Sequence, residues 1–397
     1  MKKFAASYVC TLVGPPLKNG IVTVDDDGTI IGVTDTGGKL YESERMEFYS
    51  GILAPGFVNA HCHLELSHLL GRISEKKGLP AFIGEINRLR NVPEAEMVQA
   101  ARLADREMYR LGISAVGDIS NTTLTLPVKR ESPIRYFTFA ETFGFHPSRA
   151  DRAFALARDV FESFRDEKLP VSVTPHAPYS VSDELFEKIR NFAEETRLPL
   201  ALHNQECAGE NQFYQTGDGP ILDHLQHNLG LDTAHWKPAG KNSLETVLPK
   251  LPAANRLLLV HNTFTGQHDL ERLKALRPGH NTWLVLCPQA NLYIEDRLPP
   301  VGLFRQAQLP ICIGTDSLAS NHRLSVLSEL VTLQLHFPEI GIEELLTWAC
   351  RNGAQALGID DRFGTLEEGK RPGLLLLSGV DLKNRKLTPE SRVKRLA

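Results

Sequence analysis

The sequence predicts an α/β protein, a (β/α)8 TIM barrel flanked by a small β-sandwich that is built from both termini. Eight apolar segments of strand length recur between residues 52 and 317, and most are separated by stretches with helical spacing. Their apolar residues run continuously instead of alternating with polar ones, which is typical of strands buried on both faces of a parallel sheet. Eight successive strand–helix units favour a closed barrel.

The predicted elements divide the chain into three parts. Residues 1–54 contain the strand patterns YVCTLVG, GIVTVDD and TIIGVTD and begin the sandwich, residues 55–364 form the barrel, and residues 365–397 complete the sandwich with KRPGLLLLSG and SRVKRLA. The barrel strands are expected in ILAPGFVNAHCH, ISAVGDIS, IRYFTFAET, VSVTPHAP, LPLALHNQE, LLLVHNT, TWLVLCPQ and PICIGTDS, with helices over 98–111, 151–167, 182–196, 267–277 and 324–336.

Two stretches have alternative interpretations. The N-terminus places two lysines before an apolar stretch, as a short signal peptide does, but polar residues such as Ser7 and Thr11 dilute that stretch and favour a strand. Residues 204–256 are long for a single connection and carry Gly, Pro and Trp236. We interpret them as a lid or insertion over the site, in which Trp236 either covers a bound ring or packs in the interior.

Composition limits the classes of function. The chain has 397 residues, of which 42% are hydrophobic and 23% charged, and a formal net charge of −4, as is ordinary for a soluble globular protein. It has no basic excess for binding nucleic acid and no apolar run of the ~18 residues that a membrane-spanning helix needs. Its six cysteines lie at least 25 residues apart, which predicts reduced thiols in a cytoplasmic protein. The oligomeric state stays open, a homo-oligomer included.

Histidines and acidic residues gather where the predicted strands end, on the face where barrel enzymes place their sites. The first strand ends in His61 and His63, and alternate residues of a strand point the same way, so both imidazoles can face one point. A single histidine is more often structural, but the whole set at one end of a barrel predicts a metal site. The other members of the set are His176, His203, Glu206, His261 and Asp316.

Other histidines are expected at the surface or in structural roles. They are His224, His227, His235, His268, His280, His322 and His336.

The donor types restrict the metal. Imidazoles with a carboxylate suit one divalent ion such as Zn²⁺, with Fe²⁺ as the alternative, and do not suit Ca²⁺ or Mg²⁺. A catalytic site keeps one position open for water, whose pKa the ion lowers toward ~7. The set contains more side chains than one such ion needs, so some of them must act as acid, base or substrate contacts.

Six motifs occur in a fixed order: PGFVNAHCHLE, TPHAPYSVS, LHNQE, VHN, CPQAN and GTDSLASN. With these motifs, the chain from about residue 50 to residue 370 resembles the amidohydrolase superfamily, in its branch of metal-dependent deaminases and chlorohydrolases. Two motifs depart from the family pattern: Ala290 replaces the usual serine of CPxSN, and GTLEEGKRPGLLLL replaces GxLxxGKxADLV.

The resemblance implies a role for each residue of the set. His61, His63, His203 and Asp316 would bind the metal, and Asp316 would also take up the proton of the attacking water. Glu206 would be the proton shuttle that touches the substrate, His261 would orient the hydroxide, and His176 would contact the substrate ring. Binuclear members carry a carboxylated lysine on the fourth strand, and VSVTPHAP has none, which argues for a single metal ion.

The expected activity is hydrolytic deamination of a nitrogen heterocycle with release of ammonia. The motifs are most similar to those of deaminases acting on adenosine-like compounds: 6-aminodeoxyfutalosine, S-adenosylhomocysteine or methylthioadenosine. To protonate a ring nitrogen, Glu206 needs a pKa raised by burial. The alternatives are a guanine- or cytosine-type deaminase, a triazine chlorohydrolase, a cyclic-amide hydrolase of the imidazolonepropionase type, and a non-catalytic binding barrel.

Three arginines have two interpretations. Arg88, Arg90 and Arg149 could bind a carboxylate on the substrate, but a solvated helix face is the favoured explanation.

Overall fold

The computed structural model describes residues 1–42, 44–279 and 281–397, so that His280 lies outside the described residues. Its centre consists of two four-stranded parallel sheets, and all eight predicted segments are strands in them. The first sheet contains β6 (Phe57–Cys62), β7 (Ile113–Ser120), β8 (Arg135–Thr142) and β9 (Val171–Pro175). The second contains β10 (Leu200–Asn204), β11 (Leu257–His261), β12 (Thr282–Leu286) and β13 (Ile311–Ile313).

Hydrogen bonds join the two sheets at both edges. Between β9 and β10, the backbone N–H of His203 donates to the carbonyl oxygen of His176 over 2.9 Å. Between β13 and β6, the N–H groups of Thr315 and Asp316 both donate to the carbonyl oxygen of His61, over 3.0 and 3.1 Å. The carboxyl ends of strands from both sheets therefore meet in one place.

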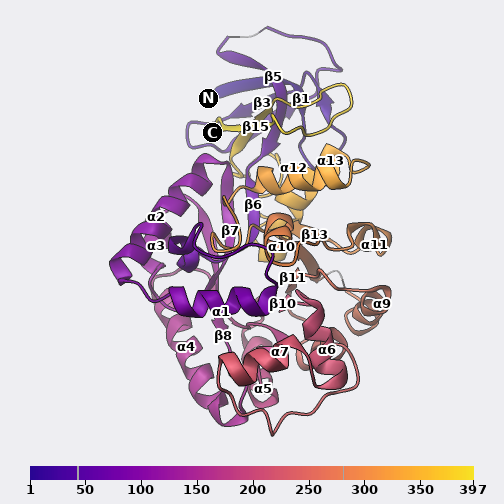
Figure 1. Cartoon of the computed structure of the whole chain (residues 1–397). Coiled ribbons are helices and arrows are strands. Elements are labelled where there is room, and N and C mark those ends of the chain that lie inside the picture. Colours follow the sequence, from indigo (N-terminus) through magenta and orange to yellow (C-terminus); the bar gives the residue numbers. More distant parts are fainter. Residues whose placement is uncertain (43, 280) are drawn as a thin grey trace.

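Helices surround these strands. The five predicted helices are present as α2 (Glu94–Arg110), α4 (Ala150–Asp166), α5 (Asp183–Thr196), α9 (Gln267–Leu276) and α12 (Val326–His336). In Figure 1, α2, α3 (Leu126–Glu131) and α4 lie on one side of the strands, and α9 and α11 (Val301–Gln306) lie on the other. None of the helices in the described part of the chain is both long and apolar enough to cross a membrane.

Several helices carried no clear signal in the sequence. They are α1 (Leu79–Leu89), α10 (Pro288–Glu295), α13 (Ile342–Leu346), α14 (Gly353–Leu357) and the short turns η1 (Leu64–Leu69), η2 (Pro147–Arg149), η3 (Pro178–Ser180), η5 (Leu248–Lys250) and η6 (Thr347–Asn352).

Both ends of the chain build one seven-stranded sheet, with the order β15-β14-β5-β1-β3-β4 and β2 beside β1. Its strands are β1 (Lys2–Val9), β2 (Leu17–Lys18), β3 (Ile21–Val24), β4 (Ile30–Thr34), β5 (Met46–Pro55), β14 (Leu374–Ser378) and β15 (Arg392–Arg395). The two termini lie close together at this sheet (Figure 1). The predicted sandwich strands are thus present, joined by hydrogen bonds into a single sheet.

A glycine connects this sheet to the central parallel strands. Gly56 separates β5 from β6, and a Cβ atom at this position would lie 2.0 Å from Ser114 Oγ and 2.3 Å from the carbonyl oxygen of Pro372. Only glycine allows the two parts of the structure to approach this closely.

The long segment 204–256 is folded. It contains α6 (Ala208–Thr216), α7 (Pro220–Asp223), the π-helix η4 (His224–Asn228) and α8 (Ser243–Val247). Trp236 stacks on Phe213 with ring centroids 3.8 Å apart, so its indole packs within this segment. Of its two interpretations, packing is therefore the one that the structure supports.

Candidate metal and substrate site

Four predicted ligands converge at the carboxyl ends of the strands. His63 Nε2 lies 3.1 Å from both His61 Nε2 and His203 Nε2. Asp316 Oδ1 lies 3.4 Å from His61 Nε2 and 3.3 Å from His63 Nε2. The four residues form a group whose candidate ligand atoms all lie within 4.8 Å of one another.

This spacing fits a zinc-like ion. Donor atoms placed tetrahedrally at the usual Zn–N and Zn–O distances of about 2.0–2.1 Å lie roughly 3.3 Å apart. The observed separations of 3.1–3.4 Å between His61, His63 and Asp316, and of 3.1 Å between His63 and His203, match that value. The donor set, three imidazoles and a carboxylate, is also the chemistry that such ions prefer.

Hydrogen bonds orient two of these ligands. His203 Nδ1 donates to the carbonyl oxygen of His176 over 2.9 Å, which leaves the Nε2 lone pair facing the other ligands. The second carboxylate oxygen of Asp316 accepts from Ser320 Oγ.

A second group, Glu141 with His176 and His203, also satisfies the distance limits for a metal. In that group, however, the atom nearest Glu141 is His203 Nδ1, which already donates its proton to His176.

Burial sets the charges of the ligands. Desolvation lowers the pKa of His61 and of His203 to about 4 and that of His63 to about 3, so these imidazoles are neutral at pH 7 and have free lone pairs. Burial acts to raise the pKa of Asp316, but the surrounding imidazoles outweigh it and hold the pKa well below its usual range, so that the side chain is a carboxylate. The site thus offers one negative charge and three neutral nitrogens.

The two predicted proton-transfer residues lie together beside the ligands. Glu206 Oε1 is 3.5 Å from His261 Nε2, and both side chains are buried. Burial, reinforced by the negative charge of Asp316, raises the pKa of Glu206 well above its usual value. Glu206 can therefore carry a proton at neutral pH, as a donor to a substrate must.

The CPQAN motif supports His261. The side-chain amide of Asn291 lies 3.5 Å from His261 Nδ1 and donates to Thr263 Oγ1 over 2.6 Å. Ala290, which replaces the usual serine, is fully buried among apolar side chains. The departure from the motif therefore falls in the hydrophobic core, and Asn291 retains its place beside the site.

A cavity of about 250 Å³ opens over the ligands and contains all three remaining predicted groups, His176, Glu206 and His261, at its lining. His176 holds its orientation through Nδ1, which is 2.9 Å from Ser180 Oγ. The apolar part of the lining comes from α1, with Phe82, which the sequence did not assign to the site, and from η4, with Leu225, which belongs to the segment 204–256. His224 of η4, expected to be structural, also lines the cavity.

The structure adds acidic residues that sequence reasoning missed. The carboxylate of Glu65, just beyond His63, accepts from the backbone of Asn121 and Thr122, each over 3.0 Å. Asn121 Nδ2 in turn donates to Glu141 Oε2 over 3.1 Å, and Glu141 Oε1 lies 3.4 Å from His203 Nδ1. These residues connect His63 and His203, two predicted metal ligands from different strands. Their signal in the sequence was position alone, because Asn121 and Glu141 also stand at strand ends.

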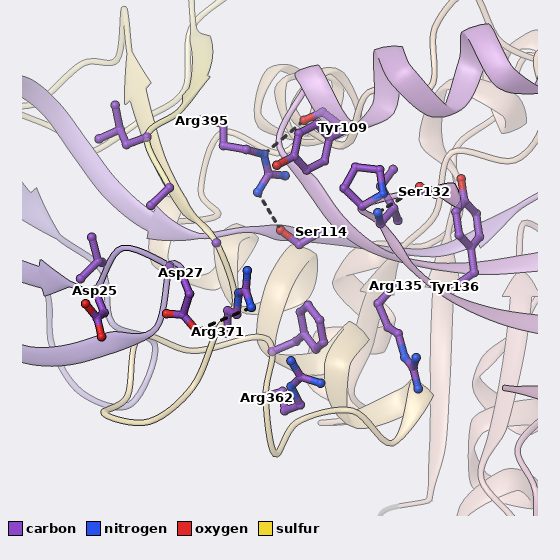
Figure 2. A pocket seen from close by; sticks show the side chains of 18 of the residues that line it. Asp25, Asp27, Tyr109, Ser114, Ser132, Arg135, Tyr136, Arg362, Arg371 and Arg395 are labelled. Carbon is purple, nitrogen blue, oxygen red and sulfur yellow. Dashed lines mark hydrogen bonds and ion pairs between the residues drawn. The ribbon is translucent and has the colours of Figure 1, made fainter. Parts of the chain in front are cut away.

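A larger cavity of about 810 Å³ lies at the other end of the strands, between β7, β8 and the terminal sheet. Figure 2 shows its basic side chains: Arg371 pairs with Asp27 at 3.7 Å, and Arg395 donates to Ser114 Oγ over 3.2 Å. No histidine occurs among the described residues that line it. Three of the predicted ligands, His63, His203 and Asp316, line the smaller cavity instead.

A parallel α/β fold with a histidine–aspartate cluster at its strand ends is typical of metal-dependent hydrolases. The sequence profile of the amidohydrolase family matches residues 52–394, and the chain belongs to this family.

Individual relatives agree with this assignment. An adenosine deaminase of Helicobacter pylori is 28% identical over 353 residues, which cover 87% of this chain and 82% of that protein. A crystal structure of Helicobacter pylori aminofutalosine deaminase in complex with methylthio-coformycin superposes with a TM-score of 0.81 at 24% identity, over 98% of this chain and 94% of that one. An adenosine deaminase from Xanthomonas campestris with bound zinc gives 0.73 at 24% identity, over 97% and 86%. The last two likenesses show a shared fold.

Proposed function

We propose that the protein is a hydrolytic deaminase of the adenine group of a 5′-substituted adenosine, with one divalent ion held by His61, His63, His203 and Asp316. The observation that carries this proposal is the convergence of four donor atoms beside a buried carboxyl group, Glu206, whose raised pKa suits a proton donor. The names of the relatives, adenosine deaminase and aminofutalosine deaminase, support the same reaction.

The proposed architecture follows the strand order. The two four-stranded sheets, linked by hydrogen bonds at both edges, form one closed (β/α)8 barrel over residues 55–364. Residues 1–54 and 365–397 form the flanking β-structure, and residues 204–256 form the lid. Closure of the barrel is what brings His61 of the first strand next to Asp316 of the last.

The residues divide the work of the reaction. When bound, a divalent ion lowers the pKa of a coordinated water toward ~7 and so makes a nucleophile available at neutral pH. Glu206 donates its proton to the ring nitrogen next to the carbon that is attacked. His261, held by Asn291, hydrogen-bonds and orients the attacking oxygen. The Asp316 carboxylate would accept one proton of the water and deliver it to the departing ammonia. The other proton of the water would leave the oxygen as the product carbonyl forms and return to Glu206, and His176 would contact the ring.

The space beyond the metal ligands suggests the form of the substrate. A second cavity of about 430 Å³ adjoins the first, and both are lined by Asn121, Glu141, Phe143 and Leu229. Its lining includes two arginines, Arg149 and Arg152. A 5′ substituent with a carboxylate, as in S-adenosylhomocysteine or aminodeoxyfutalosine, would place its negative charge there. Methylthioadenosine has an uncharged substituent and would leave both arginines unused.

The remaining properties are proposed from the same observations. Zinc is the metal we favour, since the ligand spacing suits it and the related adenosine deaminase from Xanthomonas campestris was crystallised with zinc. A small nucleoside-like molecule is the partner, without nucleic acid or membrane, and a homo-oligomer is compatible with this activity. All six cysteines are unpaired and buried, which supports a reducing, cytoplasmic location.

The test is ammonia release from a panel of compounds by the zinc-loaded protein. The panel contains adenosine, methylthioadenosine, S-adenosylhomocysteine, aminodeoxyfutalosine, guanine, cytosine, a chlorinated triazine and imidazolonepropionate. We expect ammonia from the adenosine compounds and the highest kcat/KM for one with a carboxylate. Chloride release, or a ring-opened product that has gained water without losing ammonia, would replace the proposed reaction by one of its alternatives.

Two variants test the substrate tail. Arg149→Ala/Arg152→Ala should raise KM for the carboxylate-bearing substrate by roughly tenfold, because a hydrogen bond to a charged group contributes about 1.5–3 kcal/mol. Arg88→Ala is the matched control, since Arg88 is exposed and lines neither cavity. Equal effects of both changes, or an equal effect on methylthioadenosine, would contradict the tail assignment.

A further inference from the structure

A fully buried ion pair lies next to the metal ligands and has no part in the proposed reaction. Lys129 Nζ of α3 is 2.6 Å from Asp118 Oδ2 of β7, and both side chains have an exposed fraction of 0%. The ammonium group also donates to Ser120 Oγ over 2.9 Å and to Thr138 Oγ1 over 3.0 Å. All three of its protons therefore have acceptors, and the aspartate is held in one orientation.

The second oxygen of Asp118 reaches the segment that carries the metal ligands. Asp118 pairs with Cys62, the residue between His61 and His63, in the register of β6 and β7. Its Oδ1 accepts from the backbone N–H of Leu64 over 2.8 Å. Leu64 directly follows His63 and begins the turn η1, so this hydrogen bond fixes the point where the chain leaves the strand.

His63 stands where the backbone leaves the strand. Its φ of −123° and ψ of 82° belong neither to a regular strand nor to a helix. The direction of its imidazole depends on how the chain turns at this position. Because Asp118 accepts the hydrogen bond from the Leu64 N–H, and Asp118 is held by Lys129, the ion pair is connected to His63 through a single residue.

Stability alone does not account for a pair of this kind. Two charges lose their hydration when they are buried, and well-packed apolar side chains often replace such a pair without loss of stability. What the pair provides is a fixed acceptor at one place. We propose that Lys129 and Asp118 are positioning residues for the metal site, which hold His63 in the orientation needed to bind the ion.

Two double variants separate positioning from packing. Lys129→Met/Asp118→Asn removes both charges but keeps a side-chain oxygen that can accept from Leu64. Lys129→Met/Asp118→Leu removes both charges and the acceptor. Neither leaves an unpaired buried charge. The measurement is the zinc dissociation constant of the full-length protein, by competition with a chelator, together with the unfolding midpoint of the metal-free form.

We expect the leucine variant to bind zinc about 10–100-fold more weakly, as is typical when the outer partner of a ligand is lost. The asparagine variant should stay within a few fold of the wild type. If the leucine variant does not fold, Lys129→Met/Asp118→Ala tests the same loss of the acceptor. Equal zinc affinity of wild type and the folded leucine or alanine variant would overturn the proposal.

Arg277→Met is the matched control for the loss of a buried cation. Arg277 is buried and donates to Thr282 Oγ1 over 2.8 Å and to the carbonyl oxygen of Pro252 over 2.7 Å, at the opposite end of β12 from the metal ligands. The variant Arg277→Met should have a lower unfolding midpoint than the wild type and an unchanged zinc affinity. A loss of affinity in Arg277→Met equal to that of the leucine variant would mean that stability alone governs zinc binding and would overturn the proposal.

This inference rests on the metal site of the proposed function, and the two can fail separately. A wild-type protein that binds no zinc would overturn both. If the wild type binds zinc and deaminates adenosine compounds, and the folded leucine variant binds zinc equally well, the positioning role alone is overturned.

Discussion

The substitution Glu206→Gln tests the assignment of the proton donor. Glutamine has the size and shape of a protonated glutamic acid, so the packing of this buried position is retained. It cannot donate an acidic proton to the ring nitrogen. A positioned general acid contributes roughly 10²–10⁴-fold to a rate, which corresponds to about 2.7–5.4 kcal/mol of activation free energy. We therefore expect kcat to fall by that factor, with a much smaller change in KM.

The same substitution has a signature in stability. Burial, with the charge of Asp316, raises the pKa of Glu206 in the folded state above its value in the unfolded chain. A group whose pKa is raised by folding stabilises the protein below its unfolded pKa, and this contribution is lost as the pH rises through the folded pKa. Glu206→Gln, which does not titrate, should match the wild type near pH 4 and be the more stable protein at pH 8.

The assay combines ammonia release with metal analysis and thermal unfolding. Glu206 is not among the four converging ligands, so Glu206→Gln should retain the full zinc content of the wild type. A variant with zinc bound and kcat within threefold of wild type would refute the role of Glu206 as proton donor. A variant that loses its zinc would instead show that Glu206 belongs to the metal site.

Three further outcomes are expected. His203→Ala should weaken zinc binding by more than the roughly 10–100-fold that is typical of losing a residue that only hydrogen-bonds a ligand. The measurement is the metal content after dialysis. A zinc content equal to that of the wild type would contradict the assignment of His203 as a ligand. Glu210 is buried, and burial is the main reason that its pKa is raised to about 7, so its contribution to stability is lost as the pH rises from 4.5 through 7. Glu210→Gln should therefore stabilise the protein by about 3 kcal/mol at pH 8 and not at pH 4. Equal unfolding midpoints of variant and wild type at pH 8 would refute this. Trp236→Ala removes the stack on Phe213 and should lower the free energy of unfolding, measured with denaturant, by at least ~1 kcal/mol. Unchanged stability together with a smaller difference in KM between substrates would instead favour the lid interpretation of Trp236.

The strands and the cluster of histidine and aspartate side chains were predictable because both leave a mark in the local sequence. Strands buried on both faces need continuous apolar residues, and such residues are easily recognised in LLLV of β11 and WLVL of β12. Ligands at the carboxyl ends of such strands must stand just after the apolar run, where His203 and Asp316 are found. One local pattern thus locates the element and the chemistry together.

The walls of the cavity were not predictable in the same way. Phe82 of α1 and Leu225 of η4 face the site, but along the sequence they look like any apolar residues of an amphipathic helix. Their neighbours in the sequence do not show which apolar residues pack on the strands and which line a cavity. Substrate specificity depends on that choice, which tertiary packing decides. This is why the sequence could name the reaction more closely than the substrate.

The backbone at the strand ends shows a further limit of sequence reasoning, and also what the fold contributes to the site. His261 and Asp316 have φ angles of 71° and 56°, and Gln205 and Asn262 have 46° and 56°, a left-handed region that residues with a Cβ avoid. Such conformations cost of order 1–3 kcal/mol each and persist only where the surrounding structure imposes them. A glycine at such a position would indicate the left-handed conformation in the sequence, but glycine could not supply the imidazole of His261 or the carboxylate of Asp316. The site therefore combines an unfavourable backbone with side chains that only this backbone aims at one point, and the hydrogen bonds of Thr315, Asn291 and Asn204 hold it there.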